Sequence, residues 1–343
     1  MPGPGKIRVW TSTAYAAVAV APLLFVFASL CIGRYPLSAG EVLALGWQQL
    51  TGGPATGSAT DQGVLWQVRL PRALLGAMVG GALAISGTAL QGLFRNPLVS
   101  SGILGVSSGA GFGAALAILL FNSASAAYPF AFAFGIAAVV MSYLIGRIYT
   151  ESSSSIMLVL GGVIVSSVFS ALLSLAKYMA DPTDQLPAIT FWLMGSLAAA
   201  RYSDLSLAGI PMALGTLALL GVRWRINVLS MGDTEAHSLG IDPAPTRALV
   251  VLAATLATAG AVCVSGVIGW VGLVIPHIGR MLVGNDNRLL MPLSLSLGAC
   301  FLTAVDNLAR TLTGSEIPLG ILTALVGGPF FVYLLKKTKG RGW

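Results

Sequence analysis

The sequence predicts an all-α polytopic membrane protein with about ten transmembrane helices and both termini on the cytoplasmic side. Only 9% of the 343 residues are charged, whereas 56% are hydrophobic. Apolar stretches of roughly 20 residues, the length that a helix needs to cross ~30 Å of hydrocarbon, recur along the chain. Because backbone groups in hydrocarbon must be hydrogen-bonded internally, helices are the economical structure for these stretches. We expect one integrated transmembrane domain over residues 1–343.

The predicted membrane helices follow the apolar segments in chain order. Their expected ranges are 11–32, 70–93, 102–121, 130–148, 156–176, 204–222, 247–265, 270–283, 290–311 and 318–335. The first follows Lys6 and Arg8 but has no small-residue cleavage site, so we interpret it as an uncleaved helix. The segment 270–283 is short and contains a proline, so part of it is expected to be re-entrant or sheltered inside the bundle.

The distribution of positive charge gives the orientation. With both termini inside and alternating helices, most of the 19 Lys and Arg residues fall on the cytoplasmic side. The positive-inside rule supports this topology. The net charge of +7 therefore needs no nucleic acid to explain it. The three Cys lie in apolar segments without paired spacing, which indicates neither a disulfide framework nor a metal site.

A few arginines fall on the outer side in this topology. Arg69 and Arg72 flank Pro71, which suits the first turn of a helix, so both guanidinium groups are expected at the outer mouth. They would either anchor the helix to lipid phosphate or form a cationic platform for an acidic partner. Asp306 and Arg310 lie four residues apart on one helix face, and we expect them to pair with each other. Arg310 would extend the platform if its tip reached the surface.

The stretch 95–113, RNPLVSSGILGVSSGAGFG, interrupts the apolar pattern with a break rich in Gly and Ser. Pro97 disfavours helix at Asn96 and has no backbone donor, so the preceding helix is expected to end there. Irregular backbone at membrane depth is tolerated only where it contacts protein or a water-filled cavity. The break therefore indicates a transport pathway, and a second proline-containing segment, GLVIPHIGR at 272–280, repeats the pattern.

Two connections between the spans are expected to form structure of their own. Residues 177–203 hold an Asp-Pro pair and an apolar run too short to span, which predicts a short helix at the outer mouth. Residues 223–246 change abruptly to mixed polar composition, and we interpret them as two short cytoplasmic helices joined at Gly240. Such an exposed element is either an inert linker or a contact for a soluble partner.

The chain has no motif for using ATP itself. Nothing matches the phosphate-binding pattern G-x-x-x-x-G-K-[ST], and the GAGFGA run follows no predicted strand. An intramembrane chain of acids, as expected in proton-coupled transporters, is also missing from the sequence. We therefore expect no catalytic residue and no enzyme activity in this chain, and energy is expected to come from another subunit.

Several runs together resemble the FecCD family of ABC importer permeases, which take up iron chelates, haem and cobalamin. The matching runs are VRLPRALLGAMVGGALAISGTALQGLFRNPL (68–98), GILGVSSGAG (102–111), LPAITFWLMGSLA (186–198), SGVIGWVGLVIPHIGRMLVGNDNRLLMP (265–292), DNLARTL from residue 306 and EIPLGILTALVGGPFFVYLL ending at residue 335. They occur in the family's order and cover nearly the whole chain beyond residue 68.

The resemblance implies a multi-pass subunit of the bacterial inner membrane with several partners. These are a second permease subunit forming a homodimer, two cytoplasmic ABC ATPases, a periplasmic substrate-binding protein and membrane lipid. The family's residue roles map onto three sets in this sequence. They are Arg69, Arg72 and Arg310 for docking the binding protein; Gly232, Asp233, Glu235, Ala236, Leu239 and Gly240 for coupling to the ATPase; and Asn96, Leu98, Ser154 and Ser155 for the cytoplasmic gate. Solvation of a short turn is the alternative for the two serines.

The expected function is transport by alternating access, driven by the partner ATPase. An iron chelate, either a siderophore or haem, is the first candidate cargo, and cobalamin or an oxyanion such as molybdate are the alternatives. An ion-coupled secondary transporter is a more distant alternative. No cofactor or metal is expected on this chain, because ATP and Mg would be used by the partner ATPase.

Overall fold

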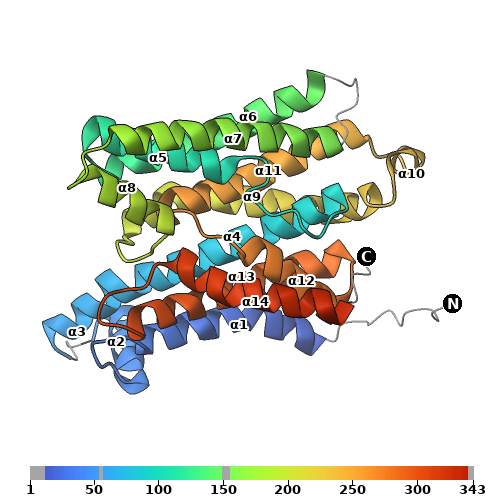
Figure 1. Ribbon diagram of the computed structural model, residues 1–343. Coiled ribbons are helices and arrows are strands. Elements are labelled where there is room, and N and C mark those ends of the chain that lie inside the picture. Colours follow the sequence, from blue (N-terminus) through green and yellow to red (C-terminus); the bar gives the residue numbers. More distant parts are fainter. Residues whose placement is uncertain (1–11, 54–56, 149–154, 339–343) are drawn as a thin grey trace.

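The computed structural model describes residues 12–53, 57–148 and 155–338, and long helices running side by side dominate it (Figure 1). Over these ranges no strand is formed, which confirms the all-α class. The helices are α1 (Ser12–Cys31), α2 (Ala39–Thr51), α3 (Ala59–Gly63), the π-helical turn η1 (Val64–Arg69), α4 (Leu70–Phe94), α5 (Val106–Phe121), α6 (Ala124–Ile148), α7 (Ser155–Met179), α8 (Gln185–Met194), α9 (Tyr202–Leu229), α10 (Asp233–Ser238), α11 (Pro243–Ser265), α12 (Val271–Val283), α13 (Asn287–Thr311) and α14 (Leu319–Thr338).

The apolar helices match the predicted membrane character. Among the described residues, six helices are long and apolar enough to cross a membrane, and four shorter apolar helices accompany them. The short ones include α5 and α12, the two segments that follow Gly-rich irregular backbone. The chain is therefore a multi-pass membrane protein, while the number of crossings and the side on which each terminus lies stay predictions.

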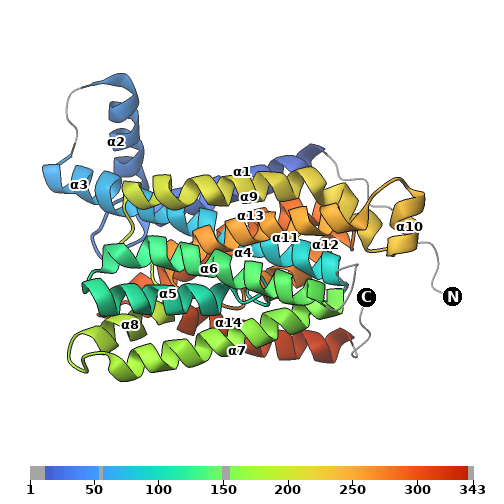
Figure 2. The ribbon, with the colours of Figure 1, turned by 90° about the horizontal axis from the view of Figure 1, so that it is seen from above.

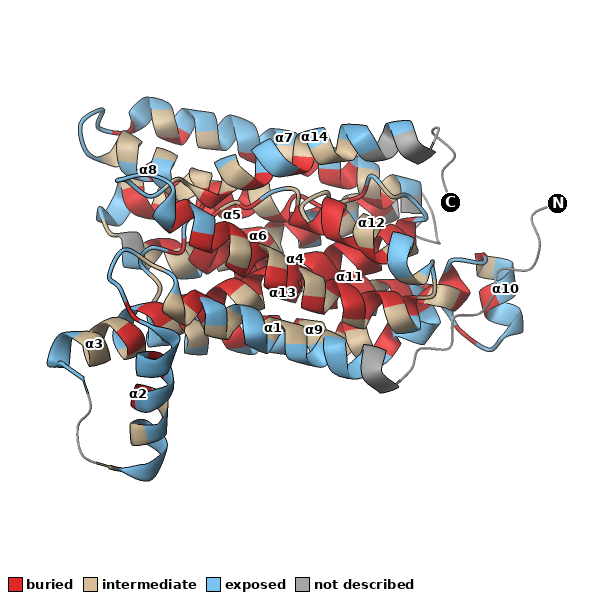
Figure 3. Ribbon diagram, turned by 90° about the horizontal axis from the view of Figure 1, so that it is seen from below, coloured by how far each residue is buried: buried red, intermediate tan, exposed pale blue. Residues whose placement is uncertain are grey.

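Helix α4 forms the centre of the bundle. It packs against α13, α9, α11 and α12, and nearly all of its length is buried. Figure 3 shows the same pattern, with buried residues concentrated on the inner helices and exposed ones on α7, α14, α1 and α9. Because lipid tails are as apolar as Leu, outward apolar side chains are expected on such peripheral helices.

Small residues allow α4 and α13 to approach each other closely. A Cβ added to Gly80 would lie 2.2 Å from the Gly298 carbonyl oxygen, and one added to Gly298 would lie 2.4 Å from that of Gly80. The two glycines thus face each other across the crossing. Such backbone contact is the usual way in which membrane helices gain packing energy without a hydrophobic driving force.

The two ends of the bundle carry different elements. The start of α1, the end of α14 and the short helix α10 lie at one end, and α2, α3 and α8 lie at the other (Figure 1). Helix α2 projects away from the bundle, as Figure 2 shows from above. We call these the α10 end and the α2 end; in the predicted topology they are cytoplasmic and outer, respectively.

The structure corrects the interpretation of residues 223–246 as two short helices. Helix α9 continues to Leu229, about two turns beyond the predicted end of its span at residue 222, and only α10 forms a separate short helix. Gly240 has φ +76° and ends the turn after α10, but the next helix is the long α11. Asp242 caps α11 by accepting a hydrogen bond from the Ala244 N–H, with Pro243 in the first turn. The strong cap explains why α11 begins so early.

Candidate functional site

The Gly- and Ser-rich break after α4 runs inside the bundle. Val99 and Leu104 are 1% and 2% exposed and the residues between them are partly buried, so this part of the segment packs against protein, whereas its first residues are largely exposed. A Cβ on Gly162 of α7 would lie 2.3 Å from the Ile103 carbonyl oxygen. The segment also reaches α12, where a Cβ on Gly272 would lie 3.2 Å from the Ser101 hydroxyl oxygen. Glycines on the neighbouring helices therefore make room for this non-helical backbone, while its part in a transport pathway stays a prediction.

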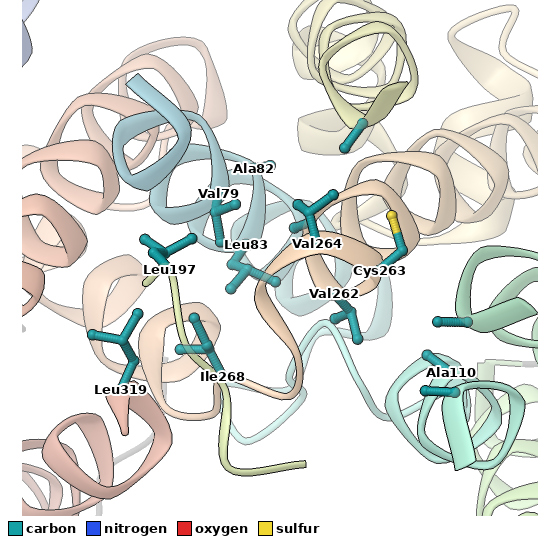
Figure 4. Packing of buried hydrophobic residues seen from close by; sticks show 14 of the residues in the cluster. Val79, Ala82, Leu83, Ala110, Leu197, Val262, Cys263, Val264, Ile268 and Leu319 are labelled. Atoms are coloured by element: carbon teal, nitrogen blue, oxygen red, sulfur yellow. The ribbon is translucent and has the colours of Figure 1, made fainter. Parts of the chain in front are cut away.

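Three more irregular segments meet beside α4. The Ser196 N–H donates to the Ser265 carbonyl oxygen at 2.8 Å, and the Leu319 N–H donates to that of Gly195 at 2.9 Å. Figure 4 shows Leu197, Ile268 and Leu319 from these segments converging beside α4. Helical hydrogen bonds lost where α8, α11 and α14 start or stop are thus replaced by bonds between the broken ends.

Arg72, at the α2 end of α4, is held in a buried ion network. Its guanidinium group donates to both carboxylate oxygens of Asp306 on α13, at 2.8 to 3.1 Å, and to both of Glu316 at 2.9 Å. Arg72 and Asp306 are 6% and 2% exposed. Burial raises the pKa of the Glu316 carboxyl, but the hydrogen bonds and charge of Arg72 outweigh it, so the pKa lies below its usual value.

Arg69 and Arg310 are also turned inward, toward α1. Arg69, 3% exposed, donates to the Leu30 carbonyl oxygen at 2.6 Å. Arg310, 6% exposed, donates at 2.7 Å to both the carbonyl and the hydroxyl oxygen of Ser29. Arg310 also contacts the side-chain oxygen of Asn307. Both arginines therefore satisfy carbonyl groups near the end of α1 and attach that helix to the bundle.

The structure brings the three predicted docking arginines together but buries them. Arg69 and Arg310 donate to the carbonyl oxygens of the adjacent Leu30 and Ser29 of α1, and Arg72 pairs with Asp306, one turn before Arg310 on α13. The expected pair between Asp306 and Arg310 is replaced, because the bidentate geometry of Arg72 takes the Asp306 carboxylate. Sequence spacing could not reveal this partner, since 234 residues separate Arg72 and Asp306. Docking by these arginines stays a prediction.

Helix α10 is fixed to the bundle on one side. Asp233, its first residue, makes an ion pair with Arg247 of α11. Ala236 is fully buried in the core cluster that also contains Ile241. Gly232 precedes the helix with φ +143°, and a Cβ there would lie 2.0 Å from a Glu235 carboxylate oxygen. Gly232, Asp233 and Ala236, all predicted coupling residues, therefore set the position of α10.

The other side of α10 is exposed at the end of the molecule. Glu235, His237 and Gly240 are exposed, and Leu239 is 53% exposed. Met231, just before the helix, is 61% exposed. Two apolar side chains beside polar ones on a projecting element resemble the composition of protein interfaces. The role of this face as a contact for a soluble partner stays a prediction.

The predicted gate residues lie at the start of the buried break. Asn96 accepts a hydrogen bond from the Leu98 N–H at 2.9 Å, which forms a tight turn and leaves Leu98 57% exposed. Ser155 is the first residue of α7, while Ser154 lies outside the described residues. The gating role of these four residues stays a prediction.

This arrangement of broken helices, a buried break and a projecting short helix defines a multi-pass transport permease. The FecCD transport family matches residues 21–337, so the chain belongs to that family. It is the permease type of ABC importers of the metal-chelate and FecCD class. The resemblance found in the sequence motifs is thereby confirmed.

Named relatives and one solved structure agree with the assignment. The chain is 43% identical over 314 residues to the molybdate import system permease protein MolB of Haemophilus influenzae, covering 92% of each chain. It is 42% identical over 279 residues to the probable iron chelatin transport system permease protein of Helicobacter pylori, covering 81% of this chain and 83% of that one. A solved structure of a metal-chelate type ABC transporter in an inward-facing conformation matches with TM-score 0.84 and 40% identity, over 95% of this chain and all of that one.

Proposed function

We propose that this permease moves an iron chelate, a siderophore or haem, across the bacterial inner membrane into the cytoplasm. The observation that carries the proposal is the agreement between two likenesses, a relative named for iron chelatin at 42% identity and a metal-chelate type transporter structure at 40% identity. The irregular segments around α4 present mainly small and apolar residues, which suits a bulky ligand that must pass without sticking. A binding protein would supply the affinity.

The transport cycle would use the two ends of the bundle in turn. A loaded binding protein docks at the α2 end, and two ATPases, which use ATP and Mg, close against α10 at the other end. Asp233 of α10 forms an ion pair with Arg247 of α11, and α11 packs against α4 and α9. A displacement of α10 would therefore be transmitted to α11 and from there to these two helices. Closure of the ATPases would then be converted into tilting of the permease halves.

A second copy of this chain would complete the pathway. Helices α7 and α14 expose apolar side chains along much of their length, including Val163, Val168, Leu325 and Val326. Large apolar faces on peripheral helices contact either lipid or another subunit. We propose that part of this face forms the homodimer contact.

Docking at the α2 end can be tested through the residue that competes for Arg72. The Glu316 carboxylate accepts hydrogen bonds from the Arg72 guanidinium, and its side chain is 32% exposed. If an acidic side chain of the binding protein takes that place, Glu316→Gln should tighten docking, and Arg72→Gln should weaken it while the protein still folds. Binding-protein affinity that stays unchanged in both folded variants would remove Arg72 from the docking site.

Molybdate is the second candidate cargo, because the relative named for molybdate is 43% identical over 92% of both chains. The discriminating experiment is uptake into proteoliposomes that contain the permease, its ATPase and the binding protein encoded beside it. We expect accumulation of a radiolabelled ferric siderophore or haem, but not of molybdate or cobalamin. Uptake of molybdate alone would show that the cargo is the oxyanion and not an iron chelate.

The same vesicles test the energy source. Uptake should require ATP on the side that exposes α10 and should stop when the ATPase is left out. Accumulation driven by a proton or sodium gradient without ATP would instead favour an ion-coupled secondary transporter.

A further inference from the structure

A polar cavity lies at the α10 end, apart from α10 itself. Its volume is about 240 Å³, far larger than the roughly 30 Å³ that one water molecule occupies in the liquid. The ends of α4, α9 and α12 and the start of α13 form its walls. The polar side chains that line it include Gln91, Arg95, Ser230, Arg280, Asn285 and Asn287.

The lining is positively charged. Two of the described lining residues, Arg95 and Arg280, are arginines, and none is acidic. The nearest acid along the chain, Asp286, is directed elsewhere: it accepts hydrogen bonds from Arg288 at 2.8 Å and from the Asn227 side chain at 2.6 Å. The remaining polar side chains are amides and the hydroxyls of Thr88 and Ser230. Both hydroxyls donate to backbone carbonyl oxygens, so the amides are the neutral groups that can donate to an anion.

Gln91 positions Arg280 at this cavity. Gln91 is fully buried, and its side-chain nitrogen donates to the Gly272 carbonyl oxygen at 3.1 Å. That bond fixes the amide so that its oxygen accepts from the Arg280 guanidinium. The contact holds the guanidinium in place through a neutral group. Gly92 keeps the wall open, because a Cβ there would lie 3.2 Å from the Asn287 side-chain nitrogen.

Arg95 occupies a backbone position that favours glycine. It ends α4 with φ +50°, in the left-handed region, and its N–H bonds back to the last turn. A residue with a side chain costs about 1 kcal/mol more than Gly in this conformation. Because Arg95 holds this unfavourable conformation at the exposed rim of a positively charged cavity, we infer that its side chain has a functional role there.

We propose that this cavity binds a phosphate group, using Arg95 and Arg280 as the charged donors and the neighbouring amides as neutral ones. The group belongs either to the headgroup of an anionic phospholipid or to free phosphate. Arginines suit this chemistry because the guanidinium fork matches two oxygens of a phosphate. The bound group would link α4, α12 and α13 at the end where the ATPase is expected to act. The proposal does not depend on which cargo is carried.

The test measures thermal unfolding of the full-length permease in nanodiscs of neutral phosphatidylcholine. Inorganic phosphate is titrated at constant ionic strength, and in a second arm phosphatidylglycerol replaces part of the neutral lipid. The variants are Arg280→Gln and Arg95→Gly, the latter being compatible with the left-handed backbone. Arg225→Gln, an exposed arginine of α9 outside the cavity, is the matched control.

We expect a saturable rise of the unfolding midpoint in one arm, which identifies the source of the phosphate group. Arg280→Gln and Arg95→Gly should each need about tenfold more ligand for the same rise, because each removes a charge-assisted contact. The Arg225→Gln protein should behave like the parent. Equal responses in all four proteins, or no response in either arm, would overturn the proposal.

Discussion

The two ends of the bundle use arginine in different ways. At the α2 end, Arg72 is buried against the carboxylates of Asp306 and Glu316, and the charges are matched within the protein. At the α10 end, Arg280 contacts the neutral Gln91 beside an open cavity, and α10 exposes Leu239. A matched buried network holds helices together, whereas a cavity lined by arginines and amides and an exposed apolar face are suited to contacts with other molecules. By this comparison, internal ion pairs fix the α2 end, whereas the α10 end presents groups that can bind other molecules.

Removal of Arg72 should have the largest effect on stability. Arg72→Met leaves Asp306 buried without its cation, and breaking a buried pair in this way costs about 3–5 kcal/mol. We expect the free energy of unfolding in detergent to fall by that amount. The double variant Arg72→Met/Asp306→Leu should recover much of the loss, because no charge then remains buried on α13. Equal losses in both variants would mean that packing, and not charge, braces this end.

A charge on the exposed face of α10 should act on assembly and leave stability unchanged. Leu239→Asp places a carboxylate where an apolar contact with the ATPase is proposed, and we expect about tenfold weaker association. Pull-down of the ATPase at graded concentrations measures it. Leu43→Asp is the matched control, since Leu43 is a 61% exposed leucine of α2 at the opposite end. If Leu43→Asp weakened association as much as Leu239→Asp, α10 would lose its proposed role.

Acid pH should slightly lower the free energy of unfolding through the Glu316 carboxylate at the α2 end. The pKa of Glu316 is lowered, so its ionised form contributes stability above its unfolded-state pKa, and this stability is lost as the pH falls through the lowered value. Because the Glu316 side chain is 32% exposed, the effect should be below about 1 kcal/mol. Unfolding midpoints of the parent and Glu316→Gln, measured from neutral to acid pH, should converge on acidification. A constant gap between them would contradict the assignment.

The sequence predicted where along the chain the arginines near the α2 end lie, but it did not predict the residues with which they pair. Helical spacing placed Asp306 and Arg310 on one face, and they do share α13. The carboxylate nevertheless pairs with Arg72 of α4, because the close crossing at Gly80 and Gly298 brings those two helices together. Spacing along one helix predicts which side chains can meet. Here Arg310 of the same helix and Arg72 of α4 could both pair with Asp306, and the packing of α4 against α13 favours Arg72.

The sequence by itself determined the class of protein and the places where helices break. An apolar chain must hydrogen-bond its backbone within helices, and Pro97 and the glycines after it stop them, whatever the tertiary structure. Only the tertiary structure decided that the break lies buried against Gly162, that Arg72 faces Asp306, and that Arg95 and Arg280 share a cavity. These contacts join segments far apart in the chain, and their geometry depends on how closely whole helices pack.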